Sequence, residues 1–334
     1  MTCEAVMYKL SDIKGKRFLV VGDMIVDHYR YLAPSKLSPE APVIIFKPVS
    51  EEWRLGGAAN VAHNLRDLGA NAHLCTVVGP DHPEPWLHEH WRYGPPPIID
   101  KGRKTTIKER LVGTKFQQIA RIDIQQGTPI SKDAAAELVE NIRVSLMPTE
   151  WNPEVIVLSD YDHGVMTHEV VRAILEMAKD RPILVDSKAM DTLSKYKGCT
   201  IFKANDIEAR RMSKLDDDFE DQHIARFIHR ALRCEGVAVT LGAKGVAFSS
   251  KEGVHTYPAV TPHGKDEVVD VTGAGDTVMA AIAAGLSLGM PYDLAIKLAN
   301  VAAGVVVHKN GVATATIEEI VDVLETQPPY GIGR

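Results

Sequence analysis

The stretch from Asp270 to Thr277 carries the residue types that phosphoryl transfer needs. It reads Asp-Val-Thr-Gly-Ala-Gly-Asp-Thr, and the small residues after it predict a helix over 277–288. The first N–H groups of a helix have no intrahelical partners and face the positive end of its dipole, so they favour an anion. The candidate anion hole consists of Gly273, Ala274 and Gly275.

Asp276 lies beside this hole and is the candidate catalytic base. A carboxylate next to a phosphate cradle makes electrostatic sense if it takes a proton from a hydroxyl that attacks a phosphoryl group. The alternative is an ordinary helix N-cap followed by an acidic first turn.

A second group of polar and glycine residues lies far upstream. A predicted strand over 17–21 ends in Gly-Asp, and a Gly-Gly-x-x-Asn element follows at 56–60. Carboxylate and amide groups suit sugar hydroxyls, and the candidates are Asp23, Asp27 and Asn60. Asp27 has an alternative role, which is to close a turn. Gly56 and Gly57 either let the backbone approach a ligand or only form a turn.

These elements, in this order, resemble those of the ribokinase-like (PfkB) carbohydrate kinases. The resemblance runs from about residue 22 to residue 316 and includes two further motifs, Asn205-x-x-Glu208 and Thr240-Leu-Gly242-x-x-Gly245. It implies one kinase domain over 1–330 with a three-layer α/β/α fold and a mostly parallel sheet. It also implies a small β-lid, formed by residues 29–49 and 105–124, that covers the sugar and pairs with the lid of a second copy.

The resemblance also implies ATP as the phosphoryl donor and Mg²⁺ as a cofactor. It assigns Asn205 and Glu208 to the Mg²⁺ and phosphate environment, with the metal held through water, although their spacing fits a helix capping box equally well. Lys188 is a candidate for a phosphate oxygen or a plain surface lysine. The nucleotide-binding residues that the resemblance implies are Asn205, Thr240, Gly242, Gly245, Asn300 and Lys188.

A narrower likeness points to the D-glycero-β-D-manno-heptose 7-phosphate 1-kinases of this family, which include the kinase half of a bifunctional enzyme of ADP-heptose synthesis for lipopolysaccharide. It rests on Ser-Pro-Glu-Ala-Pro-Val at 38–43, Lys-Thr-Thr-Ile-Lys-Glu-Arg at 104–110 and Ser-Asp-Tyr at 159–161. It implies phosphorylation at O1, with substrate contacts from Asp23, Asp27, Gly56, Gly57, Asn60, Lys104, Arg110 and Asp270. The lid cations Lys108 and Arg121 are further candidates for the 7-phosphate.

Three departures from that pattern bear on the sugar. Asp162 and His163 stand where the heptose kinases have glycine and lysine, and their Asp-Pro-Lys-Gly pattern reads Asp-Ser-Lys-Ala at 186–189. The 80–102 segment is short and rich in proline. A histidine in place of a lysine predicts weaker or pH-dependent phosphate binding, since histidine titrates near pH 6.5.

Composition excludes several other classes of function. The formal net charge of −6 and the lack of a basic run disfavour nucleic-acid and membrane partners. The four cysteines have no C-x-x-C spacing, which favours thiols in a reducing cytoplasm. There is no P-loop motif and no strand-linked G-x-G-x-x-G, and the histidines at 82–90 lack a metal-ligand framework.

Alternating strand and helix patterns from residue 155 onward predict a parallel sheet with helices on both faces. The candidate residues follow predicted strands, and ligands bind at the carboxyl ends of such strands, so one cleft is expected. Two other functions stay open: a kinase for another sugar, sugar phosphate or nucleoside, and a non-catalytic regulator that binds a nucleotide or sugar.

Overall fold

The computed structural model describes residues 10–113, 117–125, 127–148, 151–189, 192–215, 218–262 and 267–326. The ends of the expected kinase domain and part of the expected second lid segment, residues 114–116, therefore lie outside the described residues, as does Cys3. Among the helices of the described ranges, none has the length and apolar character that a membrane crossing requires.

An eight-stranded sheet forms the middle layer, in the order β14-β13-β12-β11-β10-β9-β1-β4. The strands from β4 to β12 pair in parallel, and β13 and β14 close one edge as an antiparallel hairpin. Their bounds are β1 Arg17–Gly22, β4 Asn71–Cys75, β9 Val155–Asp160, β10 Ile183–Ser187, β11 Ile201–Asn205, β12 Gly236–Thr240, β13 Val246–Ser250 and β14 Gly253–Tyr257.

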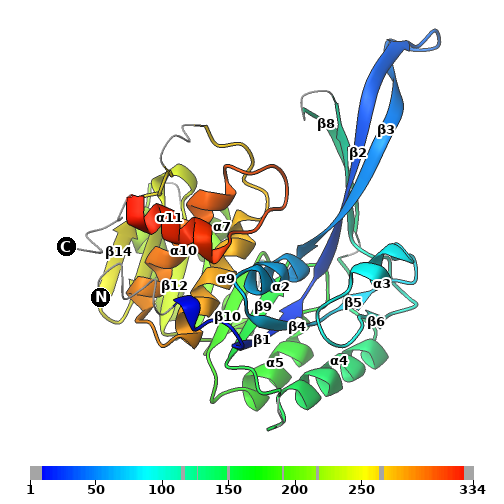
Figure 1. The fold of residues 1–334 in the computed structure, drawn as a ribbon. Helices are drawn as coiled ribbons and strands as arrows, with labels where there is room; N and C mark the ends of the chain where they lie inside the picture. The colour runs from blue at the N-terminus through cyan, green and yellow to red at the C-terminus, as the bar shows by residue number, and fades with distance from the viewer. Residues whose placement is uncertain are drawn as a thin grey trace.

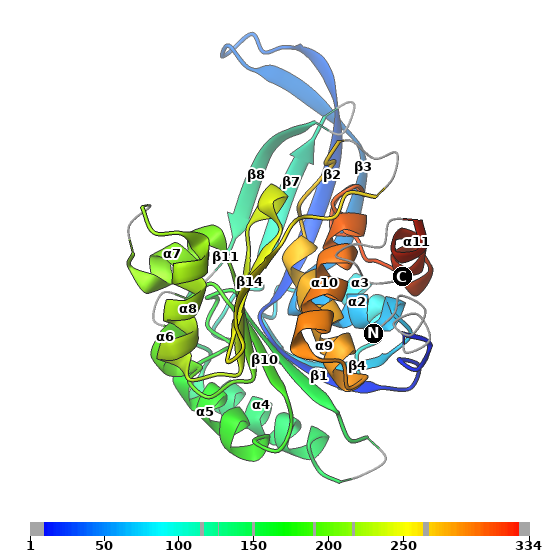
Figure 2. The same ribbon diagram turned by 90° about the vertical axis from the view of Figure 1, so that its left-hand side faces the viewer.

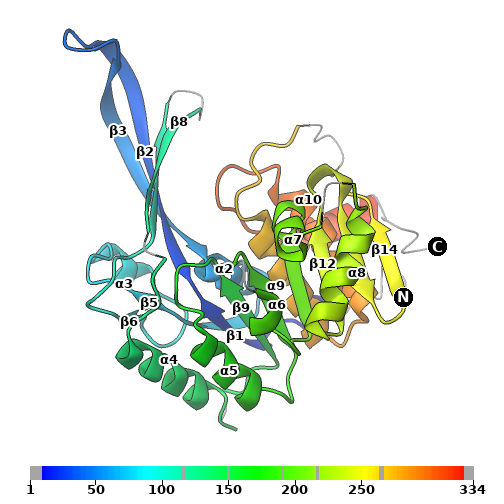
Figure 3. The ribbon, with the colours of Figure 1, turned by 180° about the vertical axis from the view of Figure 1, so that it is seen from behind.

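Helices cover both faces of this sheet, as the view in Figure 2 shows. On one side lie α2 (Ala58–Asp67), α9 (Ala274–Ser287), α10 (Tyr292–Val306) and α11 (Ile317–Thr326). On the other, which faces the viewer in Figure 3, lie α4 (Lys132–Ser145), α5 (His168–Met177), α6 (Thr192–Lys195), α7 (Asp206–Ser213) and α8 (Asp221–Leu232). The predicted three-layer α/β/α fold is confirmed.

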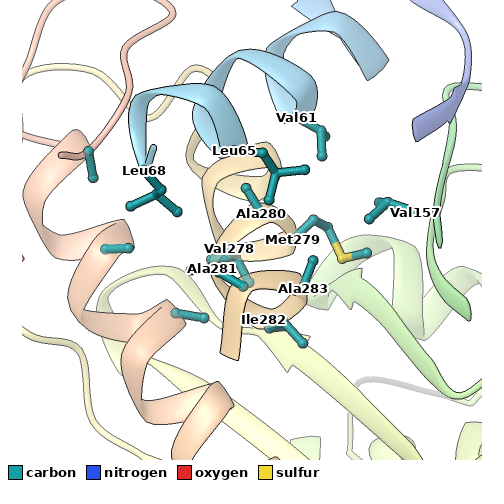
Figure 4. Close-up of a cluster of buried hydrophobic side chains, with 14 of the residues drawn as sticks. Val61, Leu65, Leu68, Val157, Val278, Met279, Ala280, Ala281, Ile282 and Ala283 are labelled. Carbon is teal, nitrogen blue, oxygen red and sulfur yellow. The ribbon is translucent and has the colours of Figure 1, made fainter. Parts of the chain in front are cut away.

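Alternation along the strands builds two separate cores. Phe18 and Val20 of β1 pack toward α2 and α9, whereas Leu19 and Val21 pack toward the opposite helices. Successive side chains of a strand point to opposite faces, so a strand buried on both sides is apolar throughout. Figure 4 shows the first core, where α9 presents small residues that let it pack close to α2.

A second sheet of four strands, β3-β2-β7-β8, rises away from the body as a lid (Figure 1). Its strands are β2 (Met24–Leu37), β3 (Ile44–Gly57), β7 (Ile107–Val112) and β8 (Gln118–Ile124). The first hairpin of the lid, β2 and β3, is longer at both ends than the expected segment 29–49. The reason is that β2 starts soon after β1 ends and β3 continues to the start of α2. Near its base lie α3 (Trp86–His90) and the short pair β5 (Val77–Val78) and β6 (Ile98–Ile99).

Candidate functional site

A cleft of about 640 Å³ lies between the lid and the carboxyl ends of the parallel strands. It brings together residues that are far apart in the sequence, as expected for a sheet of this kind. The predicted site residues that line it are Asp27, Gly56, Gly57, Arg110, Lys188, Asn205, Glu208, Thr240, Gly242, Gly245, Gly273, Ala274, Gly275, Asp276 and Asn300.

Asp276 lies in the first turn of α9 and is buried. Its Oδ2 accepts a hydrogen bond from Asn60 Nδ2 at 2.8 Å, and its Oδ1 accepts one from the Tyr161 hydroxyl at 2.7 Å. Burial raises the pKa of Asp276, and the two hydrogen bonds and Lys188 oppose this shift. A buried carboxylate that is aimed by two donors is suited to accept a proton.

The glycine turn before Asp276 lies against two donor side chains. Gly273 is the N-cap of α9 at φ 82°, and a Cβ there would lie 2.8 Å from Asn60 Nδ2. A Cβ on Gly275 would lie 2.8 Å from Lys203 Nζ. The positive φ favours glycine at 273, and a side chain at 275 would have to displace the Lys203 ammonium group. The turn thus places N–H groups and an ammonium group at one end of the helix.

Lys203 is a buried cation in the middle of β11. Its Nζ lies 2.8 Å from Asp186 Oδ2, and both side chains are about 5% exposed or less. Burial alone lowers the pKa of Lys203, but the carboxylates of Asp186 and Glu208 outweigh it and raise the pKa overall. The ammonium group is therefore charged, and it lies where phosphate oxygens would meet the N-terminus of α9.

Asn205 and Glu208 form the capping box of α7. Asn205 Oδ1 accepts from the Glu208 backbone N–H, and Glu208 Oε2 accepts from the Asn205 backbone N–H, each at 2.8 Å. The helix-capping interpretation is thus confirmed, and both residues also line the cleft. Burial raises the pKa of Glu208, against the opposing effect of Lys203.

The donor set around Asp186 and Glu208 fits a magnesium ion. Asp186 Oδ1 is buried and makes no hydrogen bond to any residue that the structure describes, so this oxygen is available to a ligand. Magnesium prefers carboxylate oxygens, phosphate oxygens and water. Asp186 and Glu208 are the residues that would hold it, with Asn205 adjacent.

Cations from the lid and from the sheet meet at the other end of the cleft. Arg110 Nη2 lies 2.8 Å from Asp27 Oδ1, an ion pair in which both side chains are almost fully buried. Lys188 Nζ lies 3.6 Å from the centre of the Tyr161 ring, and Lys108 Nζ lies 5.7 Å from it. The cleft lining also includes Arg121. This concentration of positive charge is suited to anionic ligands.

The opposite wall consists of the β12–β13 turn and α10. Gly242 faces open space at φ 56°, whereas a Cβ on Gly245 would overlap the Tyr257 carbonyl. Asn300 of α10 is buried and donates through Nδ2 to the Pro258 carbonyl at 2.7 Å. Gly304, one turn further along, lies against the Val260 backbone. Gly242, Gly245, Asn300 and Gly304 all line the cleft.

Four predicted substrate contacts do not line the cleft in the described structure. Asp23 is 1% exposed and accepts hydrogen bonds from the backbone N–H groups of Tyr161, His163 and Val165, so it supports the loop below the cleft. Asn60 is fully buried and donates to Asp276.

The other two are loop or surface residues. Asp270 accepts from the backbone N–H groups of Thr272 and Gly311, and so fixes the glycine turn. Lys104 is exposed beside the base of the lid. Sequence position alone could not separate these roles, because each of these residues belongs to a motif or follows a strand whether or not it lines the cleft.

The two departures at 162 and 163 have structural explanations. Asp162 adopts φ 62°, a left-handed conformation that glycine adopts freely and aspartate tolerates. Burial, followed by Lys108 and Lys188, lowers the pKa of His163 to about 4. The expectation that His163 titrates near pH 6.5 is wrong, because this ring is buried beside cations and stays neutral.

Three residues of the site received no role from sequence reasoning: Tyr161, Asp186 and Lys203. The signal for Lys203 was a charged residue inside a strand that is otherwise apolar, which a buried strand tolerates only when the charge is paired. Nothing in the sequence indicated that the Tyr161 hydroxyl would reach Asp276.

The profile of the pfkB family of carbohydrate kinases matches residues 16–319, which include the lid, the sheet and the Asp276 turn. The chain belongs to this family. It is therefore a carbohydrate kinase, and the fold and the family expected from the sequence are confirmed. The non-catalytic alternative is not supported by this membership.

Among curated relatives of this pfkB kinase are two proteins named Bifunctional protein HldE. The one from Campylobacter jejuni subsp. jejuni serotype O:6 is 39% identical over 319 residues, which cover 93% of this chain and 65% of that protein. The one from Helicobacter hepaticus is 35% identical over 323 residues, with 94% and 65% covered. The chain thus spans 65% of the length of these relatives.

Solved structures agree on the fold of this pfkB kinase. Ribokinase from Arabidopsis thaliana, complexed with ribose and ATP, has a TM-score of 0.69 and 19% identity, and the match covers 93% of this chain and 99% of that one. Phosphofructokinase-2 from Escherichia coli, in complex with potassium, has a TM-score of 0.73 and 16% identity, with 94% and 99% covered.

Proposed function

We propose that this kinase transfers the γ-phosphoryl group of ATP to O1 of D-glycero-β-D-manno-heptose 7-phosphate and forms the 1,7-bisphosphate. The observation that carries the proposal is the buried carboxylate of Asp276, which lies at an anion-binding helix N-terminus in the same cleft as the lid cations Lys108, Arg110 and Arg121. The similarity to proteins named HldE supports the choice of sugar phosphate.

Asp276 is the general base in this reaction. It removes the proton from the acceptor hydroxyl as the oxygen bonds to the γ-phosphorus and the bond to the β-phosphate oxygen breaks, which releases ADP. The backbone N–H groups of Gly273, Ala274 and Gly275 bind the negative charge on the transferred group. Lys203, beside Gly275, adds a full positive charge at the same place.

The lid side of the cleft binds the sugar phosphate. Asp27, which lies beside Arg110, accepts hydrogen bonds from sugar hydroxyls. Gly56 and Gly57 let the backbone approach the sugar ring. Arg110, Arg121 and Lys108 take the 7-phosphate, because a guanidinium group binds phosphate oxygens in pairs. In this assignment Lys104, Asp23, Asn60 and Asp270 act outside the direct contacts.

The wall of the cleft formed by α10 and the β12–β13 turn binds the nucleotide. Thr240, Gly242 and Gly245 contact the phosphates and the ribose. Asn300 and the small residues near it form the wall of the adenine pocket, and Lys188 reaches a phosphate oxygen.

Bound Mg²⁺ supplies neutralisation of the phosphate charge. Asp186 and Glu208 would hold it, with Asn205 beside them.

A second candidate, a pfkB kinase for another sugar, sugar phosphate or nucleoside, is favoured by one observation. The lysine of the heptose kinase pattern is replaced by His163, which is buried and stays uncharged. The phosphate site of this chain therefore relies more on the lid cations.

We further propose a homodimer in which two lids pair, and a cytoplasmic location, where ATP and sugar phosphates are available. Exposed edge strands that carry apolar residues tend to pair with another chain unless they are covered. The exposed apolar residues of the lid include Leu37, Val43, Ile44, Val49, Ile119 and Ile122.

An ADP-release assay across a panel of acceptors tests the substrate. The panel contains heptose 7-phosphate, unphosphorylated heptose, fructose, fructose 6-phosphate, ribose and adenosine. We expect the highest kcat/KM for heptose 7-phosphate. If an unphosphorylated sugar or nucleoside is the best acceptor, the heptose assignment is wrong and the carbohydrate kinase activity stands.

A further inference from the structure

Two cysteines that are distant in the sequence lie side by side at the amino-terminal end of β11. Cys199 lies two residues before the start of β11, and Cys234 lies between α8 and β12. On one side of them the Gly198 backbone N–H donates to the Leu232 carbonyl at 2.9 Å. On the other side the Glu235 N–H donates to the Thr200 carbonyl at 2.9 Å. The two cysteines are therefore fixed between two backbone hydrogen bonds.

The parallel register of β11 and β12, in which Ile201 pairs with Gly236, continues back to place Cys199 opposite Cys234. The Cys234 thiol donates a hydrogen bond to the Gly236 carbonyl at 3.3 Å. The interaction between the two thiols raises the pKa of Cys199 well above its ordinary value and lowers the pKa of Cys234. Cys199 is 2% exposed, whereas Cys234 is partly exposed. Cys234 is thus the more reactive thiol, and Cys199 lies behind it as a resolving thiol.

We propose that Cys199 and Cys234 are a redox modification site that a peroxide converts into a disulfide. The Cys234 thiolate attacks one peroxide oxygen and the O–O bond breaks, which gives a sulfenic acid and a hydroxide ion; the hydroxide takes up the proton that the Cys234 thiol released and becomes one water molecule. The Cys199 sulfur then attacks the Cys234 sulfur, the S–O bond breaks, and the hydroxyl leaves with the Cys199 proton as a second water molecule. The peroxide is the oxidant, and a dithiol reductant reverses the step.

The position of the pair gives the modification a structural consequence. A Cys199–Cys234 bond closes the chain segment that contains β11 and α7, and with them Lys203, Asn205 and Glu208. Cross-linking restricts the unfolded chain, so the oxidised protein is more resistant to heat. Because the two cysteines lie at the opposite end of β11 from the cleft, the bond locks the strand without reaching into the site.

Cys75 provides an internal control. It is buried, and burial raises its pKa to about 12, so it stays a thiol under mild oxidation. Its reactivity is expected to be unchanged when Cys199 and Cys234 are linked.

The experiment treats the full chain with a small excess of hydrogen peroxide, blocks remaining thiols with iodoacetamide, and measures intact mass and non-reduced tryptic peptides. The intact mass before blocking should fall by about 2 Da, for two hydrogen atoms, and the digest of the blocked protein should contain one cross-linked peptide that joins 199 to 234. The melting temperature should rise by about 3–6 °C and return after dithiothreitol is added.

Two variants separate the outcomes. Cys234→Ser should abolish the cross-link and the thermal shift. Cys199→Ser should leave Cys234 to accumulate as the sulfenic or sulfinic acid, with no thermal shift. Oxidation of wild type that stops at a sulfinic Cys234, a cross-link to Cys3 in place of Cys199, or an unchanged thiol pair would overturn the proposal.

Discussion

The Tyr161 hydroxyl donates a hydrogen bond to Asp276 Oδ1 at 2.7 Å, across 115 residues of sequence. The loop that carries Tyr161 is held by Asp23, and the Tyr161 ring lies under the Lys188 ammonium group at 3.6 Å. A buried carboxylate, a phenol and a cation are thus stacked in the cleft. The hydrogen bond favours the charged form of Asp276 and opposes the effect of burial on its pKa.

Replacing Asp276 with asparagine keeps its shape and removes the proton acceptor. We expect kcat to fall by roughly 10²–10⁴-fold, which is the usual contribution of a positioned general base. ATP binding and the melting temperature should stay close to those of wild type. Turnover near the wild-type rate at saturating sugar would show that Asp276 is not the base.

Replacing Tyr161 with phenylalanine removes a donor to the base. Without that bond the pKa of Asp276 rises, so the base becomes protonated at higher pH and the acidic limb of the kcat profile should move up by about 0.5–1 pH unit. Measuring kcat from pH 5 to 9 tests this.

The matched control for Tyr161→Phe is Tyr196→Phe, which removes a hydroxyl from the buried carboxylate of Asp160, at 2.6 Å. Asp160 does not line the cleft. If the acidic limb of the kcat profile moves equally in Tyr161→Phe and Tyr196→Phe, the Tyr161 hydroxyl has no specific effect on the pKa of Asp276.

The lid cations should determine the preference for a phosphorylated sugar. Arg110→Ala and Arg121→Ala are each expected to reduce the ratio of kcat/KM for heptose 7-phosphate to that for heptose by about 10–100-fold, the order of a lost charge-assisted pair. Lys104→Ala is the control, because Lys104 is exposed away from the cleft. If kcat/KM falls by the same factor for heptose 7-phosphate and for heptose, the arginines only support the lid.

The exposed apolar residues of the lid should make the chain a homodimer. Light scattering at micromolar concentration is expected to give twice the mass of the chain, and Ile119→Lys with Ile122→Lys should give the monomer. Val144→Lys on α4, at a position that is 51% exposed, should leave the mass unchanged. A strict monomer of wild type would contradict pairing through the lid.

Asp23 should make stability depend on pH. Burial, followed by repulsion from Asp160, raises its pKa from 3.8 to about 6. The folded chain therefore binds this proton more tightly than the unfolded chain. The contribution of Asp23 to the free energy of unfolding therefore grows by about 3 kcal/mol as the pH falls from 6 to 3.8. This contribution is lost as the pH rises through 6.

Urea unfolding from pH 4 to pH 7 tests this effect in wild type and in Asp23→Asn. The variant lacks the titrating group. The free energy of unfolding of wild type should therefore rise relative to that of Asp23→Asn as the pH falls. Parallel curves for the two proteins would contradict a raised pKa.

Local patterns in the sequence determined much of this protein. Alternating strand and helix patterns predicted the parallel sheet, and the small residues after the glycine turn predicted a helix over 277–288, which the structure contains as α9 but which begins three residues earlier, at Ala274. Asn205 and Glu208, three residues apart, predicted a capping box that the structure contains. Each of these depends on backbone geometry within a few residues, which is why the sequence reveals it.

Only the tertiary structure decided which polar side chains face the cleft. Asp23 and Asp27 are four residues apart near the start of β2, yet Asp27 lines the cleft and Asp23 lies beneath it. Asn60, Tyr161 and Lys203 reach Asp276 or its turn from three separate elements. Such contacts depend on how strands and helices far apart in the chain pack together, and no spacing within one segment encodes that packing.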